Sequence, residues 1–372
     1  FISPDLSICN NCEKELADPS DPRYRHPFIS CMECGPRYSI IDRVPYDRDN
    51  TSMLEFDMCE FCTHQYTSRE GRRFHAQTVS CHQCGPQLAY AEKGGRECSG
   101  EAALRKAIET LDNGGIIAVK GIGGYHLACS ATNEGAVRRM RILKGREVKP
   151  FAVMFRDMSE IKSYCIVSDK ESLLLQGREK PIVLLEQRSP ALLEEVGKGS
   201  RYTGCLLPYT PLQKLILTEI SPLVMASANF SESPIIKDEV EMLGMLEDSL
   251  DGMLYNRRGI RTAIDDSVIR TVSDGVQFFR RARGYVPLPI YIKGMENQYK
   301  GDIFAAGGQT KNTFCFLKQN DRMSGNLAYL SQHIGDLDDL KTYDSYLYNI
   351  EHMKALLKAK PERICCDLHP GY

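Results

Sequence analysis

The sequence predicts an α/β (α+β) protein built from three consecutive parts. Three observations lead to this expectation: a duplicated cysteine-rich unit, an alternation of helical and strand-like segments after it, and a strand, glycine turn and strand near the end. With 372 residues, 42% of them hydrophobic, the chain is long enough to bury more than one core. The expected domains are residues 1–94, 95–292 and 301–372.

The first part contains four Cys-x2-Cys pairs, arranged as one unit that repeats after 50 residues. Eighteen residues separate the two pairs within each unit. Zinc takes four thiolates in a tetrahedron with Zn–S bonds of ~2.3 Å, and two tight Cys-x2-Cys turns supply that arrangement. Residues 1–94 are therefore expected to form two tandem zinc fingers, each with one structural ion. The predicted ligands are Cys9, Cys12, Cys31 and Cys34 in the first finger and Cys59, Cys62, Cys81 and Cys84 in the second.

These cysteines also have other interpretations. A disulfide framework would require an oxidising compartment, but no signal peptide is recognised and the other seven cysteines follow no pattern, so we expect a cytoplasmic protein. The ligands could be interleaved between the units, and His26 or His75, which precede the third cysteine of their units, could replace a thiolate. Four thiolates leave zinc no open position, so the expected role of the fingers is structural or docking.

Charge and hydropathy argue against two broad functions. Lys and Arg (47) nearly balance Asp and Glu (49) for a net charge of -2, whereas a nucleic-acid module usually carries a basic face. No uncharged apolar stretch approaches the ~18 residues of a membrane span, so we expect a soluble protein without membrane contact. The sequence begins at Phe1 and not at Met, which suggests a piece of a longer polypeptide.

The middle part alternates helices and strands, a pattern typical of an α/β layer that binds ligands at the ends of its strands. Residues 100–112 place apolar side chains on one helical face, with Ser99 positioned to cap the helix and Gly114 to end it. Ser168 and Glu171 form a capping box that begins another helix. Further helices are predicted at 133–144 and from Thr210-Pro211 onward, and strands at 115–119, 151–155, 182–185 and 223–226.

Two loops of the middle part carry residues suited to an anionic ligand. The first, Lys120 to His126, follows a predicted strand and combines a lysine with glycines that let the backbone approach a ligand. The second places three cations within six residues, Lys144, Arg146 and Lys149, which can neutralise a polyphosphate. Taken alone, a loop like the first is more often an ordinary turn, and cations like those of the second more often interact with the dipole at the end of a helix.

The loops become more specific in combination with Ser227-Ala-Asn229 and the run from Arg280 to Arg283. Lys144 with Arg146, and Ser227 with Asn229, resemble the YrdC-type domain, which binds ATP and makes carbamoyl adenylates. Joined to the doubled fingers, the whole chain resembles the hydrogenase maturation carbamoyltransferase family HypF. Further matching blocks are Gly123–Leu127, Lys149–Met154, Leu207–Leu212, Asp265–Ser267 and Arg281–Pro287.

The last part fits the same resemblance. Residues 303–308 and 313–317 predict a strand, a glycine turn and a second strand. With Ser331–Asp336 and Asp367–Pro370 they resemble the opening part of the third HypF domain, an actin-like ATPase (ribonuclease H-like) fold that performs carbamoyl transfer. The amino-terminal acylphosphatase domain of the family, and most of its transferase domain, are expected outside residues 1–372.

The resemblance implies an ATP-dependent enzyme with magnesium on the phosphates. In the family, carbamate derived from carbamoyl phosphate reacts with ATP to give carbamoyl adenylate and pyrophosphate. The carbamoyl group then passes to the C-terminal cysteine of HypE, for the cyanide ligands of NiFe hydrogenase. The implied catalytic positions are Lys120, His126, Lys144 and Arg146. The implied nucleotide and cofactor positions are Gly123, Gly124, Lys144, Arg146, Lys149, Ser227, Asn229, Arg281 and Arg283.

Two other functions use parts of the same pattern. Threonylcarbamoyl adenylate synthesis for tRNA modification uses the same type of nucleotide domain, but the fingers and residues 301–372 count against it. A zinc-ribbon adaptor without enzymatic activity would use the α/β part only as a scaffold. Asp265 and Asp266 could orient a cation, but acids in a turn are usually only solvated, so they are assigned no role.

Overall fold

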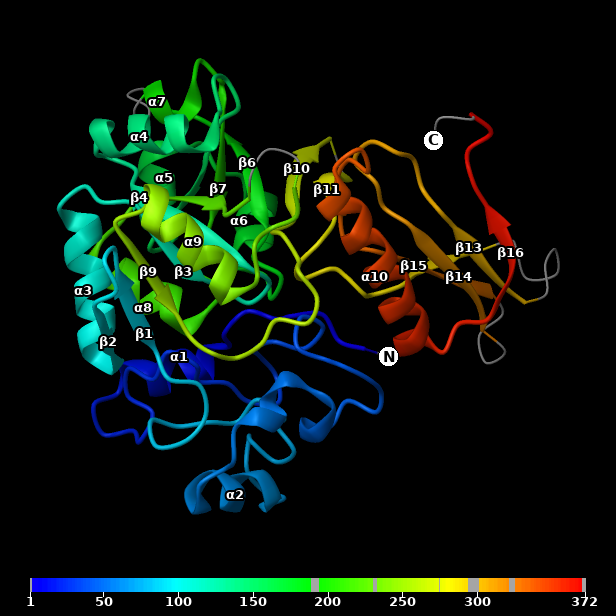
Figure 1. Ribbon diagram of the computed structural model, residues 1–372, viewed down its shortest axis with the longest axis horizontal. Coiled ribbons are helices and arrows are strands. Elements are labelled where there is room, and N and C mark those ends of the chain that lie inside the picture. The colour runs from blue at the N-terminus through cyan, green and yellow to red at the C-terminus, as the bar shows by residue number, and fades with distance from the viewer. Residues whose placement is uncertain are drawn as a thin grey trace.

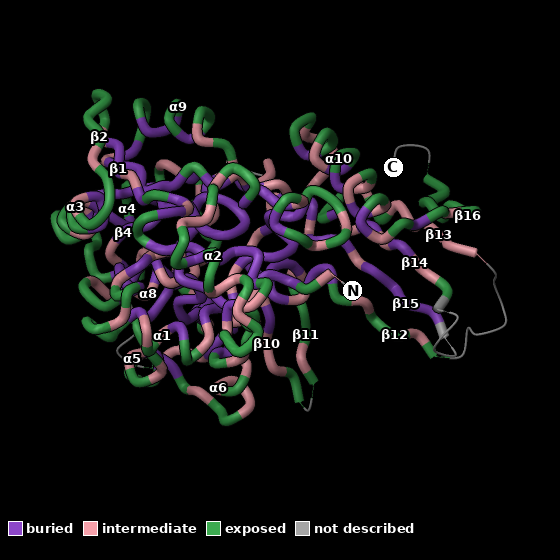
Figure 2. The backbone as a smooth tube through the Cα atoms, turned by 90° about the horizontal axis from the view of Figure 1, so that it is seen from below, coloured by how far each residue is buried: buried purple, intermediate pink, exposed green. Residues whose placement is uncertain are grey.

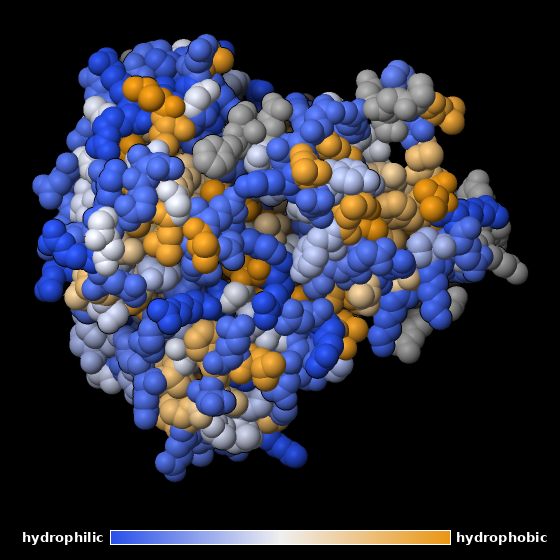
Figure 3. All heavy atoms as spheres, in the orientation of Figure 1, coloured by the Kyte–Doolittle hydropathy of each residue, from blue (hydrophilic) through white to orange (hydrophobic). Residues whose placement is uncertain are grey.

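Figure 1 shows the computed structural model of the chain, which describes residues 2–188, 194–229, 233–273, 275–293, 301–320 and 325–369. The cysteine-rich region (blue) lies beneath a large α/β body, and the last part (orange to red) lies beside both. Hydrophilic side chains cover most of the face drawn in Figure 3, with smaller hydrophobic areas between them. Among the described residues, no helix is both long and apolar enough to cross a membrane.

The cysteine-rich region has little regular structure. Helix α1 (Asn10–Ala17) and helix α2 (Glu60–Thr67) each begin directly after the first cysteine of their unit, which occupies the N-cap position. Two short 3-10 helices, η1 (Arg48–Asn50) and η2 (Ser52–Glu55), lie between the units. A region of this kind buries few apolar side chains, so its folding depends on other interactions.

The α/β body is built on one sheet of 11 strands in the order β11-β10-β6-β7-β5-β8-β4-β3-β9-β1-β2. The sheet is mixed, with parallel pairs β3/β9, β5/β7 and β6/β10 among antiparallel neighbours. The strands are β1 (Ala89–Glu92), β2 (Glu97–Ser99), β3 (Ile117–Lys120), β4 (Tyr125–Ser130), β5 (Ala152–Met154), β6 (Ile182–Glu186), β7 (Tyr202–Leu206), β8 (Leu223–Ser227), β9 (Gly252–Tyr255), β10 (Val268–Val272) and β11 (Gly275–Arg280).

Helices cover both faces of this sheet. They are α3 (Gly100–Asp112), α4 (Glu134–Lys144), α5 (Met158–Tyr164), α6 (Asp169–Gln176), α7 (Glu194–Gly197), α8 (Pro211–Glu219) and α9 (Glu239–Ser249). The predicted capping box of Ser168 and Glu171 is present at α6, and Thr210 with Gln213 forms a second at α8. Ser99 occupies the N-cap position of α3 as predicted, but its side chain makes no capping hydrogen bond.

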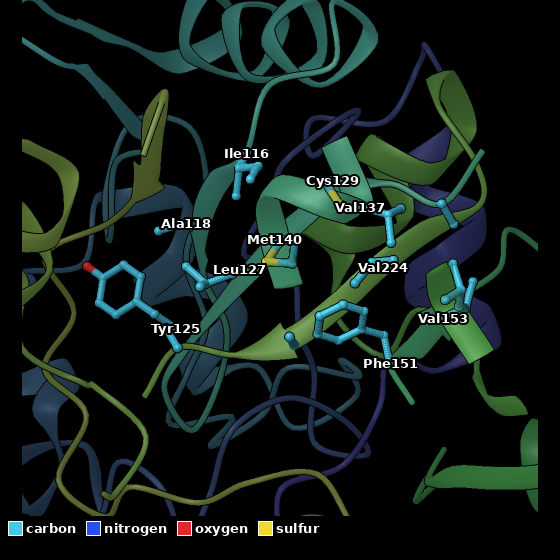
Figure 4. Close-up of a cluster of buried hydrophobic side chains, with 14 of the residues drawn as sticks. Ile116, Ala118, Tyr125, Leu127, Cys129, Val137, Met140, Phe151, Val153 and Val224 are labelled. Atoms are coloured by element: carbon cyan, nitrogen blue, oxygen red, sulfur yellow. The ribbon is translucent and has the colours of Figure 1, made fainter. Parts of the chain in front are cut away.

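Two hydrophobic clusters sandwich the strands. Ala118 of β3 belongs to the cluster beneath α4 and α9, whereas its neighbours Ile117 and Val119 belong to the cluster beneath α3 and α8. Figure 4 shows part of the first cluster, where Val137 and Met140 from α4 lie with side chains of the central strands. Strands that are buried on both faces read as continuous apolar runs, which explains why the sequence predicted them. The buried backbone, purple in Figure 2, runs through the centre of the body.

The last part contains a second sheet of five strands, ordered β12-β15-β14-β13-β16, and helix α10 (Leu340–Leu357). Its strands are β12 (Ile290–Ile292), β13 (Asp302–Ala305), β14 (Cys315–Asn320), β15 (Gly325–Leu330) and β16 (Pro361–Cys365). The predicted strand pair is confirmed, since β13 pairs antiparallel with β14. Because β1 joins the large sheet and β12 joins the second sheet, we propose domain limits just before each of these strands.

The three parts share a hydrophobic core. Tyr38 of the cysteine-rich region and Ile264 of the body pack in one cluster with Phe314 and Tyr346 of the last part. The amide of Gln332 donates to the carbonyl oxygen of Ala263 at 3.3 Å, and its side-chain oxygen accepts from the Tyr38 hydroxyl at 3.4 Å. These contacts fix the last part against the body, and a cavity lies between them.

Candidate functional site

The eight cysteines of the duplicated unit form two clusters, which match the two predicted ligand sets. In the first, the Cys9–Cys31 and Cys12–Cys34 sulfur atoms are 3.7 Å apart and the Cys31–Cys34 atoms 3.8 Å apart. The second has sulfur separations of 3.6 and 3.8 Å. A tetrahedron with Zn–S bonds of ~2.3 Å has edges of about 3.8 Å. Both clusters therefore fit one tetrahedral metal ion each, and the ligands are sequential and not interleaved.

Neither alternative histidine ligand joins a cluster. The Nε2 atom of His26 lies 3.1 Å from the Ser80 hydroxyl, and burial, with His82 nearby, lowers the pKa of His26 to about 3. The ring of His75 packs against the rings of Tyr66 and Phe74. His26 therefore packs between the two fingers, and His75 packs within the second finger. The four thiolates of each cluster are sufficient to complete a tetrahedral ligand set.

A second candidate site is a cavity of about 420 Å³ between the α/β body and the last part. The body contributes the loop after α4, the end of β8 and the end of β11, and the last part contributes the segments around Lys311 and Asp336. Five cationic and three acidic side chains line it, so the cavity favours an anion. The charged residues are Lys144, Arg146, Glu147, Lys149, Asp265, Arg280, Lys311 and Asp336.

Lys144 brings the two predicted motifs together. Its ammonium donates to the carbonyl oxygen of Ser227 at 2.9 Å and to the Oδ1 atom of Asn229 at 2.7 Å. The Ser227 hydroxyl donates to the same Asn229 oxygen at 3.0 Å. Helix α4 ends at Lys144, and the following Gly145 adopts the left-handed conformation with φ 56°, so the chain turns and the next residues line the cavity. The Lys-x-Arg and Ser-x-Asn motifs therefore form one structural unit.

Burial changes the protonation of this lysine. Desolvation, reinforced by the positive charge of Arg146, lowers the pKa of Lys144 to about 7. The guanidinium of Arg146 lies 5.6 Å from the centre of the Phe151 ring, and burial lowers its pKa as well. An anionic ligand would offset this penalty, since it adds negative charge to that of Asp265 beside the two cations.

Lys120 and the two glycines of its loop do not line this cavity. The ammonium of Lys120 is buried in an ion pair with Glu239 and donates to the carbonyl oxygens of Asn256 and Arg258, both at 2.9 Å. A Cβ atom on Gly123 would lie 2.2 Å from the Ile264 carbonyl oxygen, and one on Gly124 would lie 2.7 Å from a methyl group of Ile235. In this structure the glycines permit close packing of the chain, and the contacts of Lys120 hold the start of the loop in place.

His126 and Arg283 lie in a buried charge network behind the cavity. The Nε2 atom of His126 is 3.1 Å from Asp266, and the guanidinium of Arg283 donates to the same carboxylate at 2.6 Å. Burial alone would raise the pKa of Asp266, but Arg283 and His126 outweigh it and hold the pKa well below its usual value. Arg281 points elsewhere and donates to the carbonyl oxygens of Tyr285 and Leu288. These residues position the turn that carries Asp265 into the cavity.

Several residues that line the cavity were not predicted as site residues, among them Arg280, Lys311, His333 and Asp336. Arg280 pairs with Asp265, and the Asp336 carboxylate accepts from the backbone of Lys311. Arg280 stands in the run of arginines that the sequence displays, and His333 and Asp336 stand in the Ser331–Asp336 block, although neither signal indicated a place in this cavity. Lys311, His333 and Asp336 belong to the last part, where only folding brings them opposite Lys144.

Comparison with known proteins finds related sequences for all three parts of the chain. The HypF finger family matches residues 8–41 and 58–90, a family described as Telomere recombination (Sua5/YciO/YrdC) matches 109–282, and the HypF Kae1-like domain matches 298–372. The chain is 46% identical, over all of its length, to carbamoyltransferase HypF of Synechocystis. It belongs to the HypF family. Carbamoyltransferase HypF2 of Cupriavidus necator, another HypF protein, is 41% identical over the whole chain.

A solved HypF structure agrees in fold. Full-length HypF in its phosphate- and nucleotide-bound form superposes on the whole chain with a TM-score of 0.93 at 45% identity, and the chain covers 48% of that protein. The chain covers 48% of Synechocystis HypF and 47% of the Cupriavidus HypF2. It therefore spans about half the length of the curated HypF relatives that it matches.

Proposed function

We propose that the cavity between the body and the last part binds ATP with magnesium and forms carbamoyl adenylate. The observation that carries this proposal is the direct contact of Lys144 with Ser227 and Asn229, beside Arg146 and Lys149 in an anion-favouring cavity. The nucleotide- and phosphate-bound state of a HypF relative supports it. Of the predicted site residues, these five are proposed to contact the nucleotide.

The proposed reaction transfers an adenylyl group. An oxygen of carbamate attacks the α-phosphorus of ATP, the bond from that phosphorus to the bridging oxygen breaks, and pyrophosphate leaves with the electron pair. Such chemistry requires positioned reactants and neutralised charge, and no nucleophilic side chain. Lys144, Arg146 and Lys149 would stabilise the charge that moves to pyrophosphate, while Asn229 and the Ser227 hydroxyl orient Lys144. Magnesium would supply additional positive charge on the phosphates.

The second proposed step passes the carbamoyl group to the C-terminal cysteine of HypE and releases AMP. The cavity is lined by both the body and the last part, which supports a hand-over between them. Carbamate would come from carbamoyl phosphate. For Lys120, Gly123, Gly124, His126, Arg281 and Arg283 we propose positioning roles, because their described contacts are with the protein itself.

We further propose zinc as the ion of both cysteine clusters. Four thiolates at tetrahedral separations suit zinc, and such a closed set leaves no position for substrate. The ions would stabilise a region that buries little apolar surface.

Measuring ATP cleavage to AMP and pyrophosphate tests the adenylation proposal. Carbamate is supplied directly, so that hydrolysis of carbamoyl phosphate is not needed, and threonine with bicarbonate serves as the competing substrate pair. We expect carbamate-dependent pyrophosphate release. Dependence on threonine would favour the tRNA-modifying reaction, and no cleavage with either would favour the adaptor.

The Lys144→Ala variant identifies the site. Loss of a charge-assisted hydrogen bond should weaken ATP binding roughly 10- to 100-fold by calorimetry. The matched control is Lys162→Ala, an exposed lysine of α5 outside the cavity. Equal ATP affinity in the Lys144 variant and the control would contradict the site assignment.

A further inference from the structure

Each metal cluster receives an arginine from the opposite finger. In the second finger, Arg72 donates to the Cys12 sulfur of the first finger at 3.4 Å and lies 3.8 Å from the sulfur atoms of Cys9 and Cys31. In the first finger, Arg23 donates to the Cys62 sulfur of the second finger at 3.4 Å. Cys12 and Cys62 are equivalent positions of the repeated unit, 50 residues apart.

The backbone contacts between the fingers follow the same reciprocal pattern. The Nε atom of Arg23 donates to the Ser80 carbonyl oxygen at 2.8 Å, and the Nε atom of Arg73 donates to the Ser30 carbonyl oxygen at 3.1 Å. Both donors and both acceptors are again related by 50 residues. The crossing is therefore a property of the paired fold and not an isolated side-chain contact.

The arginines that cross between the fingers affect the electrostatic cost of burying the metal clusters. Zinc with four thiolates carries a net charge of two negative units, and burying that charge is costly unless cations compensate it. The Cys12 sulfur is fully buried, and Arg72 brings its guanidinium to it while Glu15 anchors the same group at 2.9 Å. The charge of the first cluster is thus compensated from the second finger.

The second cluster has the complementary arrangement. Arg23 is 1% exposed, and its guanidinium contacts the Cys62 sulfur, the Ser80 carbonyl oxygen and the face of the Phe61 ring. A buried guanidinium requires a negative partner, and removing that partner is strongly destabilising. If the second cluster lost its ion, its cysteines would no longer be held together beside Arg23, and the buried guanidinium would lose the group that compensates its charge.

We propose that Arg23 and Arg72 couple the two metal sites, so that loss of either ion weakens the binding of the other. The arginines act as positioning and charge-compensating residues outside the ligand sets. The inference rests on the metal ions of the proposed function and adds that the two fingers bind them as one unit.

The test follows zinc release and cysteine exposure under a chelator. Zinc content is measured first, and each cysteine is then followed by alkylation and peptide mass spectrometry after addition of excess chelator. In Arg72→Gln, the four cysteines of the first finger should become alkylated about tenfold faster, as expected for a lost charge-assisted hydrogen bond. Arg72 is a third exposed, so its replacement leaves the core intact. Arg69→Gln is the matched control, since it removes the same charge from an exposed position three residues away.

A second variant tests the coupling itself. Cys84→Ser removes a ligand of the second finger only, yet it should also accelerate alkylation of Cys9, Cys12, Cys31 and Cys34 of the first finger. With zinc bound to the unmodified protein, either of two results would overturn the inference. One is an equal alkylation rate of the first finger in Arg72→Gln and Arg69→Gln, and the other is an unchanged alkylation rate of the first finger in Cys84→Ser. Absence of zinc from the unmodified protein would overturn the proposed metal as well.

Discussion

The finger clusters and the cavity differ in how their residues are gathered. Each cluster takes its four sulfur atoms from a short stretch, Cys9 to Cys34 or Cys59 to Cys84. The cavity joins residues from Lys144 to Ser345, contributed by helices α4 and α10, strands β8 and β11 of the large sheet and the loops between them. The clusters are closed, and each has an arginine of the other finger beside one of its sulfur atoms. The cavity is open and keeps an excess of cations. The first arrangement suits permanent binding of an ion, and the second suits ligands that must enter and leave.

The largest effect that separates the two regions is expected from loss of a finger ligand. Cys84→Ser should reduce bound zinc from two ions to one or fewer, because structural zinc contributes on the order of 10 kcal/mol of binding free energy. No finger residue is among those lining the cavity, so ATP affinity should stay within about twofold, a change too small to indicate a lost contact. Zinc analysis and calorimetry measure the two quantities.

Cys98→Ser is the control for this experiment, since Cys98 is half-buried and outside both clusters. A large loss of ATP affinity in the Cys84 variant, with the control unchanged, would mean that the two regions are not independent.

A smaller effect is expected from the charge network behind the cavity. Asp266→Asn leaves the buried guanidinium of Arg283 without its counter-charge, which should lower the free energy of unfolding by about 3–5 kcal/mol. Denaturant unfolding measures the change. Asp112→Asn, at an exposed position at the end of α3, should change stability by less than about 0.5 kcal/mol. Equal stability of the two variants would show that the network does not support the cavity wall.

The smallest effect concerns pH, and it follows from the pKa of Lys144 near 7. Between about pH 7 and the usual value of 10.5, the unfolded chain keeps a proton that the folded chain has lost, so this group favours folding increasingly as pH rises. Ligand binding has the opposite sign, because an anion prefers the protonated lysine. ATP affinity should therefore fall about tenfold between pH 6 and 8, as expected when a pKa near 7 governs binding.

Lys144→Arg provides the reference for this measurement, since arginine stays charged throughout the range and the titration of ATP itself is common to both proteins. Calorimetry across the pH series gives the ratio of the two affinities. A constant ratio would contradict the assigned role of the Lys144 proton.

Local signals in the sequence were sufficient for most of the secondary structure. The capping box at Ser168, the proline that opens α8 and the apolar run that became β8 all act over a few residues, so their outcomes could be predicted. Ser99 shows the limit, because its position at a helix start did not ensure that its side chain would cap. The cysteine spacing likewise indicated both ligand sets, since tetrahedral coordination constrains neighbours along the chain.

Lys120 and Lys144 have similar sequence surroundings but different places in the fold. Both follow or precede buried strands beside glycines, and both were expected at one anionic site. In the fold, Lys144 reaches the cavity, whereas Lys120 is engaged by Glu239 and two carbonyl oxygens elsewhere. No local pattern distinguishes the two, because the partner of a buried charge is chosen by packing over more than 80 residues of chain.

Sequence alone was therefore enough for the doubled fingers and the α/β class, since both depend on spacing and periodicity over short distances. Only the tertiary structure could place Lys311, His333 and Asp336 opposite Lys144, and could cross Arg23 and Arg72 between the fingers. The physical reason is that such side chains are brought together by the shared core and by the need to compensate buried charge. Neither the shared core nor the pairing of buried charges can be recognised from neighbouring residues in the sequence.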